Sequence, residues 1–178
     1  MRKRSTRRIL EDNQNRSTPL GSHFILWLHN IRSLHNVGAA FRNADAFGVS
    51  RLLLSGYTPT PPRPEITKTA IGAEEHIPWS TVQNPAESAQ LLKNDGYHIT
   101  GLEQTDQSVI LNRFEMPSPK IVLVLGNEVT GIDDDFLPLL DSSVEIPQYG
   151  TKHSLNVSVA CGVALYGFLN LFEQKTNR

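Results

Sequence analysis

Residues 24–48 read FILWLHNIRSLHNVGAAFRNADAFG, and this stretch decides the class of fold. It begins with a run of apolar and bulky residues, 24–31, that is typical of a buried strand. Helix-forming residues follow at 36–48, and Gly48 stands where a helix C-cap is expected. The stretch therefore predicts a strand followed by a helix, which is the repeating unit of α/β proteins.

The same alternation continues toward the C-terminus. Further strands are predicted at 51–56, 97–103, 120–126 and 143–147, and further helices at 66–77, 84–96, 133–140 and 154–174. The proline-rich segment 57–65 is expected to be an extended loop. Strands that alternate with helices favour an α/β fold, a mostly parallel sheet flanked by helices, with ligands at the carboxyl ends of the strands.

Length and composition exclude several classes of protein. A chain of 178 residues is most simply one domain with its own core. The single cysteine, Cys161, cannot form an internal disulfide, which indicates a reducing compartment and a packing role. The apolar stretch 157–169 is too short to span a bilayer, and no apolar run follows the basic N-terminus to form a signal peptide. These features predict a cytoplasmic protein without a membrane segment.

The net charge of −1 conceals a basic N-terminus. Residues 1–16 hold six basic and two acidic side chains, so the remainder of the chain is acidic. A basic arm attracts nucleic acid by releasing counterions from phosphates, although such arms are often only solvated, and both interpretations are open. We expect a flexible arm at residues 1–20 and a folded domain at 21–178.

Polar loops follow the predicted strands, where this class of fold places its chemistry. They contain Asn30, Arg32 and Asn36 after the first strand, GNEVTGI at 126–132, and PQYGTKHSLN at 147–156. The second loop lacks the Lys-Ser/Thr of a phosphate-binding loop, and the chain has no G-x-G-x-x-G. The histidines are scattered without the spacing of a zinc site, so we expect no metal.

Three segments together resemble the signature motifs of the SpoU (TrmH-like) branch of the SPOUT RNA methyltransferases. They are NIRSLHNVGAAFRNADAFGV at 30–49, LGNEVTGI at 125–132 and IPQYGTKHSLNVSVACGVALY at 146–166. The resemblance covers nearly the whole chain from Phe24 onward. Enzymes of this branch transfer a methyl group from S-adenosyl-L-methionine to a ribose 2′-hydroxyl of RNA. The resemblance thus implies an RNA 2′-O-ribose methyltransferase acting on tRNA or rRNA.

The resemblance also implies features of the fold and assembly. In this family the C-terminal strands and helices form a deep trefoil knot, although knots are almost absent from proteins. The family is dimeric, with the knot region packing against its mate, so we expect a homodimer. Many relatives carry an extra N-terminal RNA-binding domain. Here the choice of substrate is expected to depend on the basic arm, the surface of the domain and the second subunit.

Backbone groups of the knot loops hold the cofactor in this family. The matching positions are Leu102, Gly126, Ile146, Ser154 and Leu155. Glycine at 126 is expected to let the chain approach the cofactor without a Cβ. Ser154 and Asn156 are expected to project from the start of the last helix toward the reacting centre, and Ser154 also fits a simple helix cap.

By the same resemblance, Arg42 is the catalytic arginine of the first motif. Because arginine stays protonated, we expect it to bind RNA phosphate and stabilise the emerging alkoxide, while a role as base is left open. From its neighbours alone, Arg42 also fits an i,i+3 surface pair with Asp45. The resemblance assigns Asn36 to orienting the substrate and the arginine, and Glu128 to fixing Arg42 or the loop geometry. From the sequence alone, Asn36 also fits a helix cap and Glu128 a solvated loop carboxylate. Ser154 and Asn156 complete this catalytic set.

Four further residues are candidate RNA contacts. Arg32 and Lys68 fit phosphate contacts, and Tyr149 and His153 fit stacking on a base, although each also fits an ordinary surface role. Two rival functions are a catalytically silent RNA-binding or assembly factor with the same fold, and an α/β enzyme for small molecules. Loss of motif residues would favour the silent factor, and all of them are present.

Overall fold

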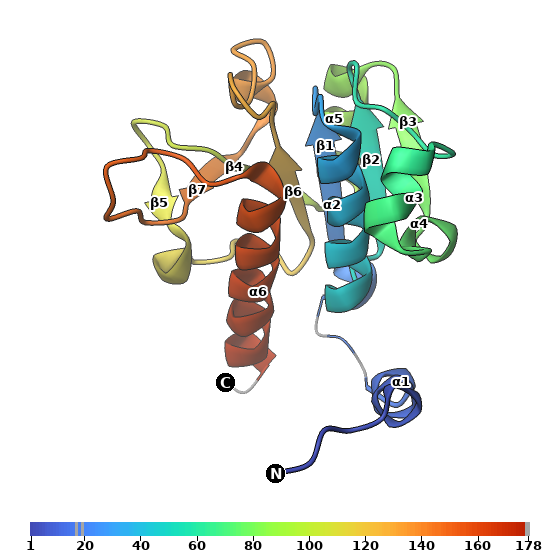
Figure 1. Ribbon diagram of the computed structural model, residues 1–178. Helices are drawn as coiled ribbons and strands as arrows, with labels where there is room; N and C mark the ends of the chain where they lie inside the picture. Colours follow the sequence, from blue (N-terminus) through green and yellow to red (C-terminus); the bar gives the residue numbers. More distant parts are fainter. Residues whose placement is uncertain (17, 19, 177–178) are drawn as a thin grey trace.

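The computed structural model describes residues 1–16, 18 and 20–176, which form a seven-stranded sheet flanked by helices (Figure 1). The strands are β1 (Phe24–His29), β2 (Arg51–Ser55), β3 (Trp79–Val82), β4 (His98–Leu102), β5 (Val109–Ile110), β6 (Ile121–Leu125) and β7 (Ser142–Glu145). Their order is β3-β2-β1-β6-β4-β7-β5, and every neighbouring pair is parallel. The predicted α/β fold is confirmed.

Helices cover both faces of the sheet. They are α1 (Thr6–Gln14), α2 (Leu34–Phe47), α3 (Pro64–Ala70), α4 (Ala73–His76), α5 (Pro85–Asn94) and α6 (Val157–Thr176), with 3-10 turns at Gly21–His23, Leu111–Arg113 and Leu137–Leu139. Phe24, Leu26 and Leu28 of β1 pack with α2, α3 and α6 (Figure 1), whereas Ile25 and Trp27 pack with α5 on the opposite face. Because successive strand residues point to opposite faces, a strand buried on both sides is apolar throughout.

The helix after β1 begins and ends at side chains that suit its termini. The Ser33 hydroxyl accepts a hydrogen bond from the Asn36 N–H, and Gly48 closes the helix with a left-handed φ of 66°. The predicted helix is therefore confirmed, but it begins earlier than expected. Its N-cap is Ser33, so the capping role considered for Asn36 is wrong.

Two predicted helices differ in the structure. The one at 66–77 is divided into α3 and α4, because Ile71 and Gly72 both take positive φ. The one at 133–140 is wrong, since this segment forms turns and a single 3-10 turn around Pro138, which lacks an N–H for a longer helix. The strands β3 and β5 were not predicted from the sequence.

The last helix begins at Val157, so the prediction that it starts at Ser154 is wrong. Its cap is Asn156, whose Oδ1 accepts a hydrogen bond from the Ser158 N–H at 2.9 Å. By length and mean hydropathy alone, Val157–Lys175 (19 residues, 1.2) could cross a membrane. The prediction that the apolar stretch at 157–169 is too short for this is therefore wrong, because the helix continues beyond residue 169. Within this segment, of which 28% is buried, Phe168 is fully buried and packs edge-on against Phe24 at 5.2 Å.

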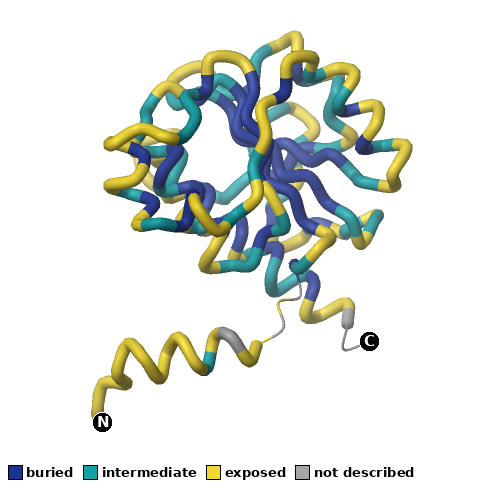
Figure 2. Tube along the Cα trace, turned by 90° about the vertical axis from the view of Figure 1, so that its right-hand side faces the viewer, coloured by how far each residue is buried: buried dark blue, intermediate teal, exposed yellow. Residues whose placement is uncertain are grey.

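The basic N-terminal arm contains a helix, α1, which is exposed along almost its whole length (Figure 2). The Ser5 hydroxyl caps it, and an ion pair joins Arg7 to Glu11 at 2.9 Å. Residues 17 and 19 of the predicted arm lie outside the described residues. The flexibility of the arm stays a prediction.

Candidate functional site

Glu128 joins the loops that follow two neighbouring strands, β1 and β6. Its carboxylate accepts hydrogen bonds from the backbone N–H groups of Arg32 and Ser33 and from Asn36 Nδ2, each at 2.9 Å. Burial raises the pKa of Glu128, but the hydrogen bonds outweigh burial and hold its pKa below the usual value. The carboxylate is therefore ionised at neutral pH and fixes the start of α2.

Asn36 and Asn156 connect this carboxylate to the last helix. Asn156 Nδ2 donates to Asn36 Oδ1 at 3.3 Å, while Asn36 donates to Glu128. About two turns further along α2, Asn43 Nδ2 donates a hydrogen bond to the Ser158 carbonyl at 3.0 Å. Three residues predicted for the site thus form one chain of hydrogen bonds, although they come from distant parts of the sequence.

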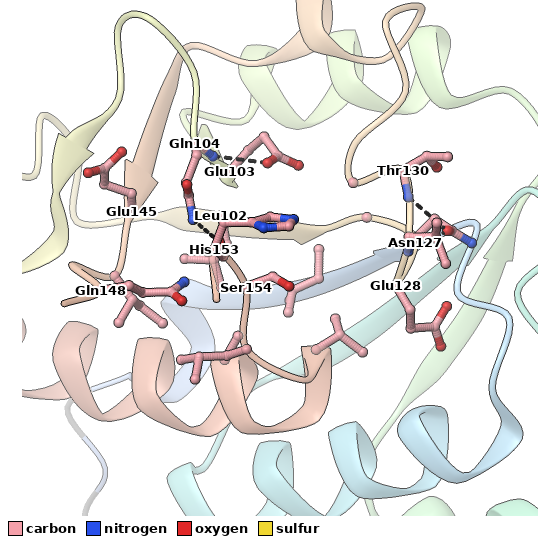
Figure 3. Close-up of a pocket in the computed structure, with 18 residues that line it drawn as sticks. Leu102, Glu103, Gln104, Asn127, Glu128, Thr130, Glu145, Gln148, His153 and Ser154 are labelled. Atoms are coloured by element: carbon pink, nitrogen blue, oxygen red, sulfur yellow. Dashed lines mark hydrogen bonds between the residues drawn. The ribbon is translucent and has the colours of Figure 1, made fainter. Parts of the chain in front are cut away.

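The loop after β6 is a tight turn held by Asn127. Asn127 and Gly131 exchange backbone hydrogen bonds at 2.8 and 3.0 Å, and Asn127 Oδ1 accepts from the Thr130 N–H at 3.1 Å (Figure 3). A Cβ added at Gly126 would overlap the backbone of Gly131 and Ile132. Packing within its own loop therefore requires glycine at 126, a reason that the sequence did not indicate.

A pocket of about 340 Å³ lies at the carboxyl ends of β4, β6 and β7, against the start of α6. Its wall includes all five residues predicted to bind the cofactor, namely Leu102, Gly126, Ile146, Ser154 and Leu155. Figure 3 shows Glu128 at one end of the pocket and Gln104, Glu145 and Gln148 at the other. The pocket has the size of a small-molecule site and the position expected for a parallel sheet.

Glu103 and Gln104 were missed by the sequence analysis, and both hold the pocket wall together. Glu103 Oε2 accepts a hydrogen bond from the Ile132 N–H at 2.8 Å, which joins the loops after β4 and β6. Gln104 Nε2 donates to the His153 carbonyl at 2.9 Å (Figure 3). Glu103 is the last residue of the strand predicted at 97–103 and Gln104 follows it, and this position at a strand end was the available signal.

Arg42 lies on the exposed surface of α2 and does not line the pocket. Within the described part of the chain, the Arg42 side chain makes no hydrogen bond or ion pair, and the pair with Asp45 is not formed. Within one polypeptide, the fold therefore brings Asn36, Glu128 and Asn156 together, whereas Arg42 lies apart from them.

The four candidate RNA contacts are all exposed. The Arg32 side chain lies free of the Glu128 carboxylate that holds its backbone, and His153 lies at the pocket. Tyr149 is 95% exposed in the loop before α6, and Lys68 is exposed in the last turn of α3.

A buried polar network behind the β1 loop was also missed. His29 Nδ1 lies 2.6 Å from Ser55 Oγ, which also accepts from Trp27 Nε1 at 2.8 Å. On its other side, His29 Nε2 lies 3.2 Å from Asp133 Oδ2. Burial lowers the pKa of His29, and the nearby Asp133 only partly opposes that shift. The network joins β1 and β2 to the segment after β6.

Within residues 1–16, 18 and 20–176, no three His, Cys, Asp or Glu side chains gather in a group that could hold a metal ion. Fold and site together define an α/β protein with a small-molecule pocket built from loops at the carboxyl edge of a parallel sheet. The chain belongs to the SpoU rRNA Methylase family, whose model matches residues 23–166.

Individual relatives agree with this family. The chain is 32% identical over 152 residues to a tRNA (guanosine(18)-2'-O)-methyltransferase of Aquifex aeolicus, covering 85% of this chain and 71% of that protein. It is also 32% identical over 153 residues to the 23S rRNA (guanosine-2'-O-)-methyltransferase RlmB of Coxiella burnetii, covering 86% of this chain and 59% of that protein.

Among solved structures, an AdoMet-bound rRNA methyltransferase from Sinorhizobium meliloti aligns with a TM-score of 0.75 and 26% identity. The alignment covers 85% of this chain and 57% of that one. The chain thus spans less than two thirds of the length of this protein and of the Coxiella relative.

Proposed function

We propose that this protein transfers the methyl group of S-adenosyl-L-methionine to a ribose 2′-hydroxyl of a structured RNA. The family, and relatives named as guanosine 2′-O-methyltransferases of tRNA and rRNA, support this activity. The observation that carries the proposal is one pocket lined by all five expected cofactor positions. At one end of it lies Glu128, whose carboxylate accepts a hydrogen bond from Asn36.

The chemistry of the pocket suits this cofactor. Three carboxylates, Glu103, Glu128 and Glu145, line it, and none of the described residues in its wall is Lys or Arg. A cavity with negative charge favours a cationic ligand, and S-adenosylmethionine carries a sulfonium and an ammonium group. The apolar side chains of Leu102, Ile146 and other lining residues suit its adenine ring.

When bound, S-adenosylmethionine supplies a methyl group that the sulfonium has already activated. The protein's main task is then to hold the ribose oxygen in line with that methyl group. We assign this positioning to the chain of Glu128, Asn36 and Asn156, which fixes the start of α2 against α6, with Ser154 at the pocket wall.

We assign to Arg42 the binding of an RNA phosphate and the stabilisation of the developing alkoxide. Its guanidinium is exposed and is not engaged by any other described side chain, so it is available to an incoming anion. Because arginine remains protonated, it acts here as a donor of hydrogen bonds.

We further propose a homodimer formed through α6. This helix exposes Val159, Val163 and Tyr166, which are 52%, 44% and 57% accessible. Beside them lies a groove of about 300 Å³ whose wall includes Leu111 and Pro147. A second copy would cover this apolar surface, and RNA would then bind across both subunits.

Contacts to RNA are assigned to exposed side chains around the site and to the basic arm. Arg32 and Lys68 suit phosphates, Tyr149 and His153 suit bases, and α1 adds positive charge. Both tRNA and rRNA remain candidate substrates. The trefoil knot and the cytoplasmic location stay predictions.

Two measurements test this function. Calorimetry tests binding of S-adenosylmethionine, and incubation with methyl-labelled S-adenosylmethionine and total RNA from a strain lacking the gene tests transfer. The natural protein should bind and label RNA, whereas Arg42→Ala should bind without labelling. If the natural protein bound the cofactor and RNA without transfer, the silent RNA-binding function would be favoured instead.

A further inference from the structure

Tyr57 is an exposed aromatic residue fixed beside the pocket. It follows β2, and 61% of the residue is accessible. Its hydroxyl accepts a hydrogen bond from Asn127 Nδ2 at 2.8 Å, and its backbone N–H donates to Asn30 Oδ1 at 3.1 Å. Asn127 precedes Glu128 and lines the pocket. Tyr57 therefore stands where the loops after β1, β2 and β6 meet.

The backbone on both sides of Tyr57 is rigidly held. Thr58 is buried, and its hydroxyl accepts from the Ile31 N–H at 3.0 Å and contacts the Ser55 carbonyl at 2.8 Å. Gly56 takes a left-handed φ of 64°, and a Cβ there would overlap Asn30 Oδ1. An exposed tyrosine on such a fixed loop loses little conformational entropy when a ligand binds to its ring.

We propose that Tyr57 stacks on an unpaired base of the substrate RNA and so forms a nucleobase subsite next to the methyl-transfer pocket. This inference rests on the proposed function. Every base has a π-face that stacks on an aromatic ring, so the subsite would position RNA without reading its sequence. Arg32 follows Asn30 and Ile31 in the loop after β1. Its exposed side chain would contact the phosphate next to the stacked base.

The structural alternative is that the ring only braces the loop through its bond to Asn127. Stacking and bracing differ in what they require of the side chain. Stacking needs an aromatic ring and affects RNA alone, whereas bracing needs the hydroxyl and would also affect the cofactor pocket, because Asn127 lines it.

Steady-state methyl transfer to total RNA from a strain lacking the gene tests the proposal, with Tyr57→Ala, Tyr57→Leu and Tyr57→Trp compared with the natural protein. Loss of the ring in the Ala and Leu variants should raise the apparent KM for RNA about 10-fold or more, as expected for a lost base stack. Tyr57→Trp should keep a KM near that of the natural protein. Calorimetric affinity for S-adenosylmethionine should be unchanged in all three.

Leu91→Ala, at an exposed position on α5, is the matched control for truncation of a surface side chain and should leave KM unchanged. An unchanged KM in Tyr57→Ala would overturn the stacking role, and so would a Tyr57→Leu variant that behaves like Tyr57→Trp. Weakened cofactor binding that parallels the rise in KM would assign Tyr57 to bracing. If the natural protein labelled no RNA, the proposed function itself would fail.

Discussion

Asn36 donates a 2.9 Å hydrogen bond to the Glu128 carboxylate across 92 residues of sequence. The same side chain accepts from Asn156, which lies 120 residues away from it. Asn36 is therefore the central member of a chain that fixes the β1 loop, the β6 loop and the start of α6 relative to one another. A substitution anywhere in this chain should disturb both the stability of the fold and the geometry of the pocket.

Replacement of Glu128 by Gln should destabilise the protein and reduce methyl transfer. The new NH₂ group would face N–H donors, and hydrogen bonds to charged groups contribute about 1.5–3 kcal/mol each. We expect a loss of about 2 kcal/mol in the free energy of unfolding, measured by urea denaturation. Glu115→Gln, at an exposed position, is the control. Equal stability and activity in Glu128→Gln and the natural protein would contradict the role of this carboxylate.

Arg42→Ala should separate catalysis from cofactor binding. Because Arg42 lies outside the pocket wall, the Kd for S-adenosylmethionine should stay within about twofold of the natural protein, whereas kcat should fall about 100-fold through loss of a charge-stabilising donor. Calorimetry and single-turnover kinetics measure the two quantities. A variant that retains full kcat would remove Arg42 from the catalytic set.

Gly126→Ala should destabilise the loop after β6, because the added Cβ overlaps the backbone of Gly131 and Ile132. Overpacking of this kind costs about 1–3 kcal/mol, and the displaced loop should also weaken cofactor binding. Gly150→Ala is the matched control, since a Cβ there meets no described atom within 4 Å. Thermal unfolding compares the two variants, and equal Tm values would show that the loop accommodates a side chain.

The stability of the protein should fall on mild acidification. Burial lowers the pKa of His29 below its ordinary value of 6.5, so below about pH 6.5 the unfolded chain binds a proton that the folded protein does not. The contribution is complete above pH 6.5 and is lost as the pH falls toward the folded pKa. Burial lowers the pKa of His98 as well.

The measurement for this prediction is the free energy of unfolding between about pH 7.5 and pH 5.5, where the effect of these two histidines is expected. The slope against pH should be shallower in His29→Gln than in the natural protein, and shallower again when His98→Gln is added. A slope that is equally steep in all three proteins would show that these histidines are not buried in the neutral form.

Val163→Glu should convert the proposed dimer into a monomer. A charged side chain at this exposed apolar position on α6 would be buried without a partner if a second copy covered the groove. Sedimentation velocity measures the change in mass. Leu91→Glu, which places the same charge on α5, should leave the assembly unchanged. A natural protein that sediments as a monomer would exclude the dimer.

Local patterns in the sequence were enough to predict the central elements of the fold. The apolar runs of β1 and β6 identify strands buried on both faces, and Gly48 marks the end of α2. The edge strands β3 and β5 are short and partly exposed, so they lack the apolar pattern that identified the others.

The geometry of the candidate site was predicted in part. Residues 36, 128 and 156 were expected to lie together and do so, but the contacts of Glu103 with Ile132 and of Tyr57 with Asn127 depend on which loops meet in space. The spacing of apolar residues along the sequence does not predict such contacts between loops. The start of α6 was misplaced because Ser154 and Asn156 both suit a helix cap, and only the structure shows that Asn156 is the cap.

The central claim, methyl transfer to a ribose hydroxyl, is tested most directly by locating the methyl group on labelled RNA. A ribose 2′-O-methyl group blocks alkaline cleavage of the adjoining phosphodiester, so each modified position leaves a gap in an alkaline hydrolysis ladder. We expect such a gap at a defined nucleotide in RNA treated with the natural protein, and an uninterrupted ladder with Arg42→Ala. Label recovered on a base, with an uninterrupted ladder from the natural protein, would contradict the claim.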